Sequence, residues 1–505
     1  MKVRNFLPIF LLLAVATGLP VLTTVLAAAE PSLVIQADRI ITATGAKPIV
    51  NGAVVISGNR IIFVGPRSKM PQAKTAKVLR PRNASVLPGL FDSHVHYREW
   101  MPLLFLYYGV TTVLDTGNKT DWILAQREAL RKGEMVGPRL FTTGLAIDGV
   151  PLGDRARENT VVTSAAEARK AAQKLLRRGV DAIKVHEWLP PDLVRVVAEE
   201  AGPLHKPVLG HLGSPVDALI RAGLNCLIHP YGIELATNPD PRVRSYIQSH
   251  MADYQGRKEY YPYHELSPEG YPALIKLMIE RGVFFNPTFG AQFRGIYPQG
   301  PEFEAYDRKV FEEKIRGLPY LSPSLLADFL PFFTLLRSHP VDDAQRKTLL
   351  AGMEKVALFM REFVAAGGKM LAGTDTSRTG IPGLRLHREL ELWVDNGIPA
   401  MEALRAATQY PIELLHQDAD LGTVETGKLA DLVVVEGNPV EDIRATQNIL
   451  YVIKDGRVLS RDLVPAAEKR PQGTRRGEGP LPAETPKSLG LRLSARAVRP
   501  REEIR

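Results

Sequence analysis

The feature that most constrains the fold is a series of eight short apolar runs that alternate with segments of helical pattern. Alternating strands and helices are typical of parallel βαβ units, and eight such units can close into a (β/α)8 TIM barrel. The expected strands are residues 85–96, 111–115, 139–145, 181–186, 207–211, 226–229, 283–287 and 369–375. The sequence therefore predicts an α/β protein built on such a barrel.

The connection between the seventh and eighth runs is unusually long. Residues 289–368 are rich in Phe, Tyr, Leu and charged side chains. Connections of this length inside a compact domain rarely lack secondary structure. We therefore expect an insertion that contains helices of its own and forms an elaborated lid on the barrel.

Short strand-like runs broken by turn residues lie at both ends of the α/β region. Residues 30–87 include LVIQADRIIT and GAVVISGNRIIFVG, and residues 422–462 include ADLVVVEGNP and ILYVIKDGRVLS. Gly-Asn and Asp-Gly pairs between such runs are typical of hairpin turns. The sequence predicts one small discontinuous β-sandwich domain formed from both ends, which leaves residues 88–421 for the barrel.

The first 29 residues have the layout of a secretory signal peptide. Lys2 and Arg4 form a basic start, residues 6–26 are almost wholly apolar, and residues 27–29 are alanines. This order predicts cleavage and an exported protein, periplasmic or secreted. The alternative is an uncleaved anchor, because the apolar stretch approaches the ~20 residues that span a bilayer. Its Pro and Gly residues weaken a spanning helix, and the small residues at 27–29 favour cleavage.

The net charge of +9 is concentrated outside the α/β region. Residues 465–505 contribute +5 and the first 29 residues contribute +2, which leaves +2 for residues 30–464. The tail, residues 463–505, is rich in Pro, Arg and Glu without apolar periodicity, so we expect it to be disordered and solvated. This distribution argues against a nucleic-acid partner, although a basic tail could attract an anionic surface.

Cysteine usage adds one further constraint. Cys226 is the only cysteine, so no intrachain disulfide can form, even in an exported protein. It lies within an apolar run, which favours a position in the core over a role as a nucleophile. Stability must then come from core size, which a chain of 505 residues can supply.

Polar residues that can bind a metal ion end several of the predicted strands. His94 and His96 are two residues apart, so on a strand their side chains point the same way. A lysine inside an apolar strand is costly unless it has a partner. The carboxyl ends of barrel strands meet at one mouth, where barrel enzymes place their sites. The candidate ligands are His94, His96, Lys184, His211, His229 and Asp375.

Several longer motifs surround these residues. They are GLFDSHVH, GVTTVLDTG, GVDAIKV, VLGHLGS, LNCLIHP, LAGTDT, LHRELEL and LGTVETGKLADLVVVEGNP. Together they resemble the amidohydrolase superfamily, and within it the imidazolonepropionase-like and Xaa-Pro dipeptidase-like group. The resemblance covers residues 35–460.

The resemblance implies a binuclear metal site. Lys184 would be carbamylated by CO2 and would bridge two divalent ions. His94, His96 and Asp375 would hold one ion, and the remaining two histidines of the set would hold the other. Nitrogen and oxygen ligands without thiolate suit Zn²⁺, with Mn²⁺ or Fe²⁺ as alternatives. A metal-bridging hydroxide would attack the scissile carbonyl, and Asp375 would move the proton.

The resemblance is incomplete around the substrate. After the third strand the chain reads GLAIDGVP where dipeptidase-like members have a Gly-Gly-His-type loop, and HEWLPP follows strand four in place of a Gly-rich loop. His186, which shares a strand face with Lys184, is therefore an alternative ligand. Tyr231 and Arg378, which follow strands six and eight, are placed to contact a substrate carboxylate.

Four other polar residues are expected to support the structure. Asp92 and Asp115 belong to the first two barrel strands and are expected to orient neighbouring groups. His387 and Glu389 belong to the helix-like segment LHRELEL, where packing or surface roles are favoured over ligation.

The predicted function is hydrolysis of an amide bond, peptide-like or cyclic, in a small-molecule substrate. A lactone or ester hydrolase is the first alternative, because the same hydroxide attacks either carbonyl. A metal-free barrel that only binds ligands is the second alternative, and the complete ligand set argues against it. No stable membrane partner is expected beyond the signal segment, and homo-oligomerisation is left open.

Overall fold

The computed structural model describes residues 30–150, 159–211, 213–250, 261–293, 296–323, 326, 342–376 and 380–461. The predicted signal segment, the basic tail and Arg378 lie outside the described residues. Within them, helices and both mixed and parallel sheets give the α/β fold that the sequence predicts.

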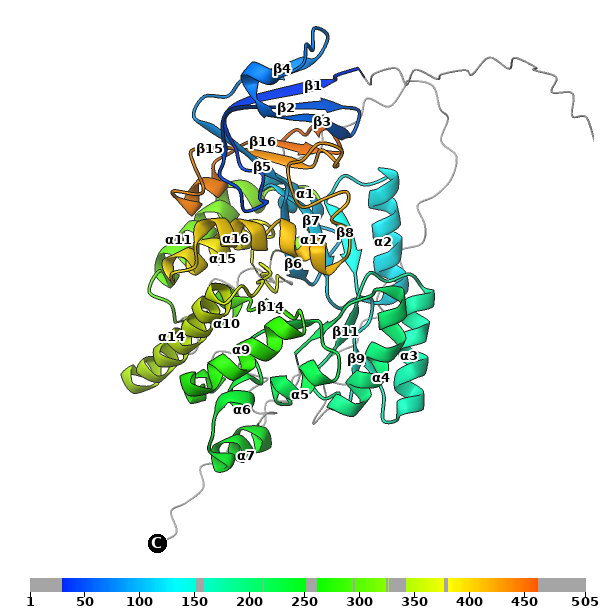
Figure 1. Ribbon diagram of the computed structural model, residues 1–505, viewed down its shortest axis with the longest axis vertical. Helices are drawn as coiled ribbons and strands as arrows, with labels where there is room; N and C mark the ends of the chain where they lie inside the picture. The colour runs from blue at the N-terminus through cyan, green and yellow to red at the C-terminus, as the bar shows by residue number, and fades with distance from the viewer. Residues whose placement is uncertain are drawn as a thin grey trace, which may run out of the picture. The chain divides into compact units, whose positions relative to one another are not determined.

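Strands from both ends of the chain form one mixed sheet. Figure 1 shows the blue N-terminal and orange C-terminal strands side by side, in the order β17-β16-β15-β5-β1-β2-β3, with β4 paired to β1. The strands are β1 (Leu33–Ile40), β2 (Ile49–Ser57), β3 (Arg60–Pro66), β4 (Lys77–Leu79), β5 (Ala84–Pro88), β15 (Leu432–Glu436), β16 (Ile449–Lys454) and β17 (Arg457–Val458). All eight strands belong to a single hydrogen-bonded sheet.

β15 joins this sheet to the rest of the molecule. Its side chains alternate in direction, as strand geometry requires. Leu432 and Val434 are buried in the small core of the mixed sheet, whereas Val433 and Val435 are buried in the main core. The strand pairs antiparallel with both β5 and β16. One five-residue strand therefore contributes to two cores.

The remaining strands are all parallel. One sheet has the order β6-β7-β8 and the other the order β10-β9-β11-β12-β13-β14. Their bounds are β6 (Leu90–Val95), β7 (Val110–Asp115), β8 (Arg139–Thr142), β9 (Ile147–Asp148), β10 (Thr160–Val161), β11 (Ile183–Val185), β12 (Val208–Gly210), β13 (Cys226–Ile228) and β14 (Phe284–Asn286). The predicted runs contain β6, β8, β11, β12, β13 and β14, and β7 begins one residue before its run. β9 and β10 are short strands that lie outside the predicted runs.

The first run differs from the prediction, because residues 85–96 divide into two strands. β5 belongs to the mixed sheet and β6 to a parallel sheet, with Gly89 between them. A Cβ on Gly89 would lie 2.0 Å from Thr111 Oγ1, so a larger residue would force the two segments apart. A glycine at this point lets one apolar run serve two sheets.

The eighth run is extended but is not a regular strand. It forms isolated parallel bridges, one between Met370 and Phe285 of β14 and one between Thr376 and Val95 of β6. Backbone hydrogen bonds continue on both sides, from Leu371 N to Phe285 O at 2.8 Å and from Ser93 N to Ala372 O at 3.0 Å. The segment thus lies between β14 and β6. At its end Asp375 has a left-handed φ of 51°, which interrupts a regular ladder.

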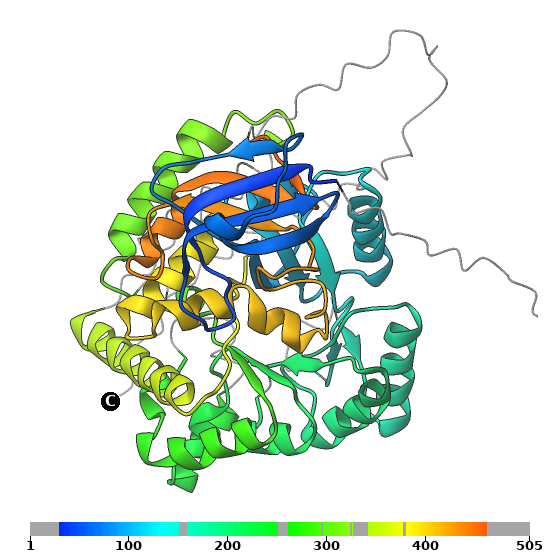
Figure 2. The same ribbon diagram turned by 45° about the horizontal axis from the view of Figure 1, so that its top comes forward.

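Helices follow the parallel strands and lie on their outer side (Figure 2). They are α1 (Pro102–Tyr107), α2 (Thr120–Lys132), α3 (Ala165–Arg177), α4 (Pro191–Ala201), α5 (Val216–Arg221), α6 (Ile233–Thr237), α7 (Pro241–Ser249), α9 (Tyr271–Glu280), α10 (Phe289–Gln292), α11 (Gly300–Val310), α14 (Asp343–Ala365), α15 (Leu384–Asp395), α16 (Ala400–Ala406) and α17 (Gln409–Leu414). In the part of the chain that the structure describes, none of them is both long and apolar enough to cross a membrane.

The long connection between the last two runs contains helices, as expected. Its described residues include α10, α11, a π-helix at Phe311–Ile315 and α14. A capping box begins α14, in which Asp342 accepts from Gln345 N and the Gln345 side chain accepts from Asp342 N. This local signal starts a helix that packs against α9.

Candidate metal centre

The six predicted ligands all lie at the carboxyl ends of parallel strands or on the extended eighth run. His94 is in β6, Lys184 is in β11, and His211 and His229 directly follow β12 and β13. All of them are buried or nearly so, except that the His96 side chain is 33% exposed. Parallel pairing of neighbouring strands places these ends at one edge.

Five histidine rings form a continuous line across this edge. Ring centroids are separated by 5.5 Å between His96 and His94, and by 5.2 Å between His94 and His229. The line continues with 4.6 Å from His229 to His211 and 4.7 Å from His211 to His186. His186, the alternative ligand, is therefore at the far end of the same line.

One group that could hold a metal ion lies in the first half of this line. The ligand atoms of His94, His229 and Asp375 lie within 4.8 Å of one another. Asp375 Oδ1 is 3.4 Å from His94 Nε2 and 3.2 Å from His96 Nε2, so both histidines of the first motif face this carboxylate. Among the described residues, the next helix after Asp375 is α15, whose N-cap residue is Gly383.

A second such group lies in the other half of the line. It consists of His186, Glu187 and His211, whose ligand atoms again lie within 4.8 Å of one another. Glu187 had no role in the sequence prediction. The signal for it in the sequence is that this acid directly follows His186, the alternative ligand.

Lys184 shapes the electrostatics of the centre. Lys184 is only 1% exposed. Burial, and then the positive charge of Lys184, lowers the pKa of His94 to about 3. His94 is therefore neutral at physiological pH, which is the state in which an imidazole binds a metal. An ammonium close to the histidines opposes a cation at the same place.

Thr288 and Gln292, which the sequence analysis did not single out, orient His229. The Thr288 hydroxyl donates to Pro287 O at 2.7 Å and lies 2.5 Å from His229 Nδ1. Because the Thr288 hydroxyl donates its proton to Pro287 O, its oxygen accepts from Nδ1–H of His229. The lone pair of His229 Nε2 then remains available to the centre. Gln292 Nε2 also donates to this hydroxyl, at 3.3 Å.

Tyr231 lies beside the second half of the histidine line. Its ring centroid is 5.6 Å from that of His211 and 5.2 Å from that of His229. Its hydroxyl donates to Gln292 Oε1 at 2.8 Å, and Tyr263 donates to the same oxygen at 2.9 Å. The structure thus places Tyr231 next to the candidate ligands and joins it to the residues that orient His229.

Three residues at this edge have left-handed backbone conformations. They are His229, Thr288 and Asp375, with φ of 59°, 45° and 51°. Such conformations cost roughly 1–3 kcal/mol each outside glycine and cluster at functional sites. Here they turn the chain sharply where β13, β14 and the extended eighth run end.

Asp92 and Asp115 stabilise the backbone around the ligands, as expected. Asp92 is fully buried and accepts from the Thr374 hydroxyl at 2.6 Å, from Thr374 N at 3.1 Å and from His94 N at 3.3 Å. Burial raises its pKa to about 7. Asp115 accepts from Tyr97 N at 3.0 Å. Asp92 therefore ties the segment of the first histidine to the segment of Asp375.

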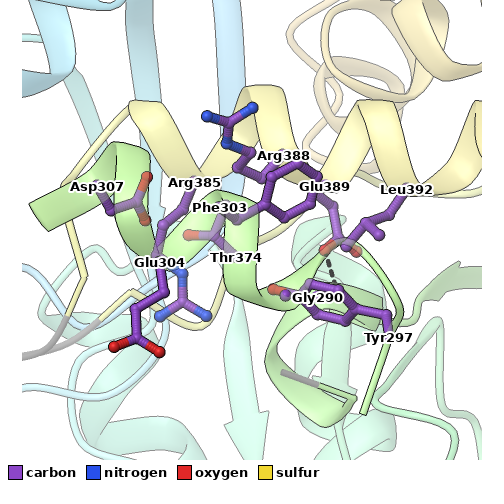
Figure 3. Close-up of a pocket in the computed structure, with 11 residues that line it drawn as sticks. Gly290, Tyr297, Phe303, Glu304, Asp307, Thr374, Arg385, Arg388, Glu389 and Leu392 are labelled. Carbon is purple, nitrogen blue, oxygen red and sulfur yellow. Dashed lines mark hydrogen bonds between the residues drawn. The ribbon is translucent and has the colours of Figure 1, made fainter. Parts of the chain in front are cut away.

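A separate pocket lies between α15 and α11, next to Thr374 (Figure 3). Arg385 and Glu389 project into it from α15, and Glu304 and Asp307 from α11. The six predicted ligands do not line it. The pocket is thus distinct from the metal centre, although Thr374, which lines the pocket, directly precedes Asp375 in the chain.

Glu389 connects this pocket to the residues behind the centre. Its carboxylate accepts from Phe289 N at 2.6 Å, Gly290 N at 2.7 Å and Trp393 Nε1 at 2.9 Å, and so holds the start of α10. Burial raises its pKa to about 7. His387 is likewise buried, with both ring nitrogens hydrogen-bonded. Glu389 and His387 therefore have packing roles, as the sequence suggested.

Cys226 occupies the core position expected for it. It is 1% exposed in β13, and burial raises the pKa of its thiol to about 12. A thiol in this state is a poor nucleophile near neutral pH.

Comparison with known proteins places the chain in one family. The sequence model of the amidohydrolase family matches residues 105–459, more than half of the chain. Ochratoxinase from Aspergillus niger is 22% identical over 492 residues, which cover 84% of this chain and 86% of that protein. Imidazolonepropionase from Pseudomonas paraeruginosa is 26% identical over 414 residues, which cover 78% and 89%.

A solved structure agrees with these sequence matches. A Xaa-Pro dipeptidase with methionine bound in its active site superposes with a TM-score of 0.59 at 22% identity, covering 85% of this chain and 99% of that one. At this identity the likeness shows a common fold. The chain therefore belongs to the amidohydrolase family and is a hydrolase that acts on carbon–nitrogen bonds.

Proposed function

We propose that the protein is an exported, binuclear metal-dependent hydrolase that cleaves a peptide-like or cyclic amide. The observation that carries this proposal is the line of five histidine rings, with carboxylates at both halves, at the carboxyl ends of parallel strands. Ochratoxinase, imidazolonepropionase and a Xaa-Pro dipeptidase are among the relatives, which supports an amide in one of these two forms.

The donor set fits divalent metal ions. All candidate donors are imidazole nitrogens or carboxylate oxygens, which suits Zn²⁺, with Mn²⁺ or Fe²⁺ as alternatives. Buried His94 Nδ1 has no hydrogen-bond partner among the described residues, which leaves this ring free of a competing interaction at that nitrogen. Bound ions would make a water molecule more acidic and would polarise the scissile carbonyl. His94, His96 and Asp375 would hold one ion.

We propose that Lys184 reacts with CO2 and completes the ligand set together with His211 and His229. The ammonium first loses one proton; the neutral amine then forms a bond to the carbon of CO2 and releases a second proton, so a side chain of charge +1 becomes a carbamate of charge −1. Support comes from the charge of Lys184, which acts on His94 and so lies close to the ligands. The change of sign converts repulsion of a cation into attraction.

Asp375 is the group proposed to move the proton. Its carboxylate accepts a proton from the attacking water as the new carbon–oxygen bond forms. It then delivers that proton to the leaving nitrogen as the carbon–nitrogen bond breaks. Tyr231 and Arg378 are proposed to contact a carboxylate of the substrate.

We also propose that the parallel strands close into a (β/α)8 barrel over residues 88–421, with residues 289–368 inserted as a lid. The bridges of the eighth run to β14 and β6 support closure. A β-sandwich formed by residues 30–87 and 422–462 is supported by one buried cluster that contains Ile35 of β1 and Val434 of β15.

Export is proposed from the sequence of residues 1–29 alone. If the segment is a cleaved signal peptide, N-terminal sequencing of the exported protein begins at Glu30. An intact Met1 in the membrane fraction would favour the anchor.

The test of the main proposal combines metal analysis with a substrate panel. The mature protein is loaded with zinc, dialysed, analysed for metal, and assayed against dipeptides, N-acyl amino acids, cyclic amides and lactones. About two zinc ions per chain with turnover of an amide supports the proposal. Turnover of lactones alone identifies an ester hydrolase, and a metal-free protein without turnover identifies a binding protein. A Lys184→Ala variant should lose metal and activity, with partial recovery on addition of a short carboxylate.

A further inference from the structure

Asp148, at the end of β9, is the starting point, because its carboxylate is fixed by four donors. Gly149 N lies 2.9 Å away, Trp188 N 2.8 Å and Asn159 Nδ2 2.9 Å. The fourth donor is His186, whose Nδ1 is 2.8 Å from Oδ2. The Asp148 side chain is only 6% exposed. A carboxylate with this many donors is held firmly in place.

The Asp148 contact determines which nitrogen of His186 is available. A carboxylate accepts only, so Nδ1 carries the proton and donates it to Asp148. Nε2 is then the nitrogen with a lone pair. Carboxylate–histidine pairs of this kind orient imidazoles that bind metal ions through the other ring nitrogen.

Glu187 and His211 complete a set of three donors with His186. Glu187 Oε1 is 3.5 Å from His211 Nε2, and their side chains are 11% and 7% exposed. Glu187 forms no ion pair with a lysine or arginine in the described ranges. A carboxylate so far removed from water is costly without a nearby cation.

We propose that His186, Glu187 and His211 bind the second divalent ion of the centre. The inference rests on the proposed function and refines it, because His186 and Glu187 become ligands in addition to those given by the family resemblance. His229 is then shared with, or belongs to, the ion at His94 and Asp375. Two neutral imidazoles and one carboxylate suit a borderline transition-metal ion such as Zn²⁺ rather than Ca²⁺ or Mg²⁺.

The experiment measures metal stoichiometry, not turnover. Metal-free full-length mature protein is titrated with Co²⁺ and followed by its visible absorption, and zinc content is measured after loading and dialysis. We expect two ions per chain in the wild type and one in both His186→Ala and Glu187→Gln. Matched controls are His205→Ala and Glu199→Gln, at exposed positions outside the centre, which should keep two ions.

A third variant tests the role of Asp148. Asp148→Asn should keep both ions at saturation but weaken the second binding step by about 10–100-fold, as for other residues that orient a metal-binding histidine. Circular dichroism confirms that each variant folds. If His186→Ala and Glu187→Gln both retain two ions with the wild-type Co²⁺ spectrum, the inference is overturned while the proposed amide hydrolysis stands. If the wild type binds no metal, the proposed function fails as well.

Discussion

Glu234 offers the sharpest test of the electrostatics behind the candidate centre. This glutamate of α6 is fully buried. Its carboxylate accepts hydrogen bonds from Tyr261 Oη at 2.6 Å and from Gly232 N at 3.1 Å. Burial raises its pKa from 4.5 to about 7, more than these hydrogen bonds lower it. Tyr261 in turn packs on Tyr231, with ring centroids 4.5 Å apart.

The shift in the pKa of Glu234 converts to a dependence of stability on pH. Below pH 4.5 the carboxyl is protonated in both states, so ionisation costs nothing. Between pH 4.5 and about 7 the unfolded state loses the proton while the folded state keeps it, and the free energy of unfolding falls. One pKa unit corresponds to ~1.4 kcal/mol, so the full loss is about 3 kcal/mol. Above pH 7 the effect of Glu234 on the free energy of unfolding stays constant.

The substitution that isolates this effect is Glu234→Gln, which keeps the shape and cannot ionise. The difference in free energy of unfolding, variant minus wild type, should rise by about 3 kcal/mol from pH 4.5 to pH 8. Urea denaturation at half-unit pH steps measures it, and effects of metal loss at low pH cancel in the difference. Glu199→Gln, at an exposed position, should show no such rise. Parallel pH profiles for Glu234→Gln and the wild type would refute the reasoning.

Three further predictions concern the centre and its surroundings. Asp375→Asn should fold and bind at least one metal ion while kcat falls by about 10²–10⁴-fold, measured under saturating substrate; near-normal kcat would remove Asp375 as the proton carrier. Thr288→Val should release the His229 ring. ¹⁵N NMR of the metal-free wild type should show the ring proton of His229 on Nδ1. A proton on Nε2, with Nδ1 accepting from Gln292 Nε2 at 3.1 Å, would contradict this. Glu389→Ala leaves three donors, two buried and one partly buried, without their acceptor. It should lower the free energy of unfolding by about 3–6 kcal/mol in urea, more than Glu389→Gln.

The positions of the candidate ligands followed from the sequence because parallel strands impose a common direction. His94, His211, His229 and Asp375 each end an apolar run, and the structure brings all four to one edge. Periodicity alone sufficed for this, since strand ends of βαβ units meet regardless of the loops between them. The joining of strands from both ends of the chain in one β domain was predicted from the hairpin-type turns between the short apolar runs at each end.

Other features depend on contacts between distant segments and left little trace in the sequence. The division of the first run at Gly89 depends on the approach of Thr111, which a local pattern does not reveal. Glu389 looked like one acid of an amphipathic helix, yet it holds the start of α10. Glu187 and Asp148 were overlooked because each gains its meaning only from His186, whose orientation depends on a separate strand.

The double role of β15 has a consequence for how the chain is made. β5 leaves the ribosome early, but its partner β15 is translated only near the end of the chain. Until then one hydrogen-bonding edge of β5 lacks its partner strand, and neither of the two cores that β15 joins can be completed. The nascent chain therefore exposes apolar surface and an unpaired strand edge for most of its synthesis, which favours aggregation. A stop codon just before Leu432 would therefore yield an aggregation-prone product rather than a smaller working enzyme.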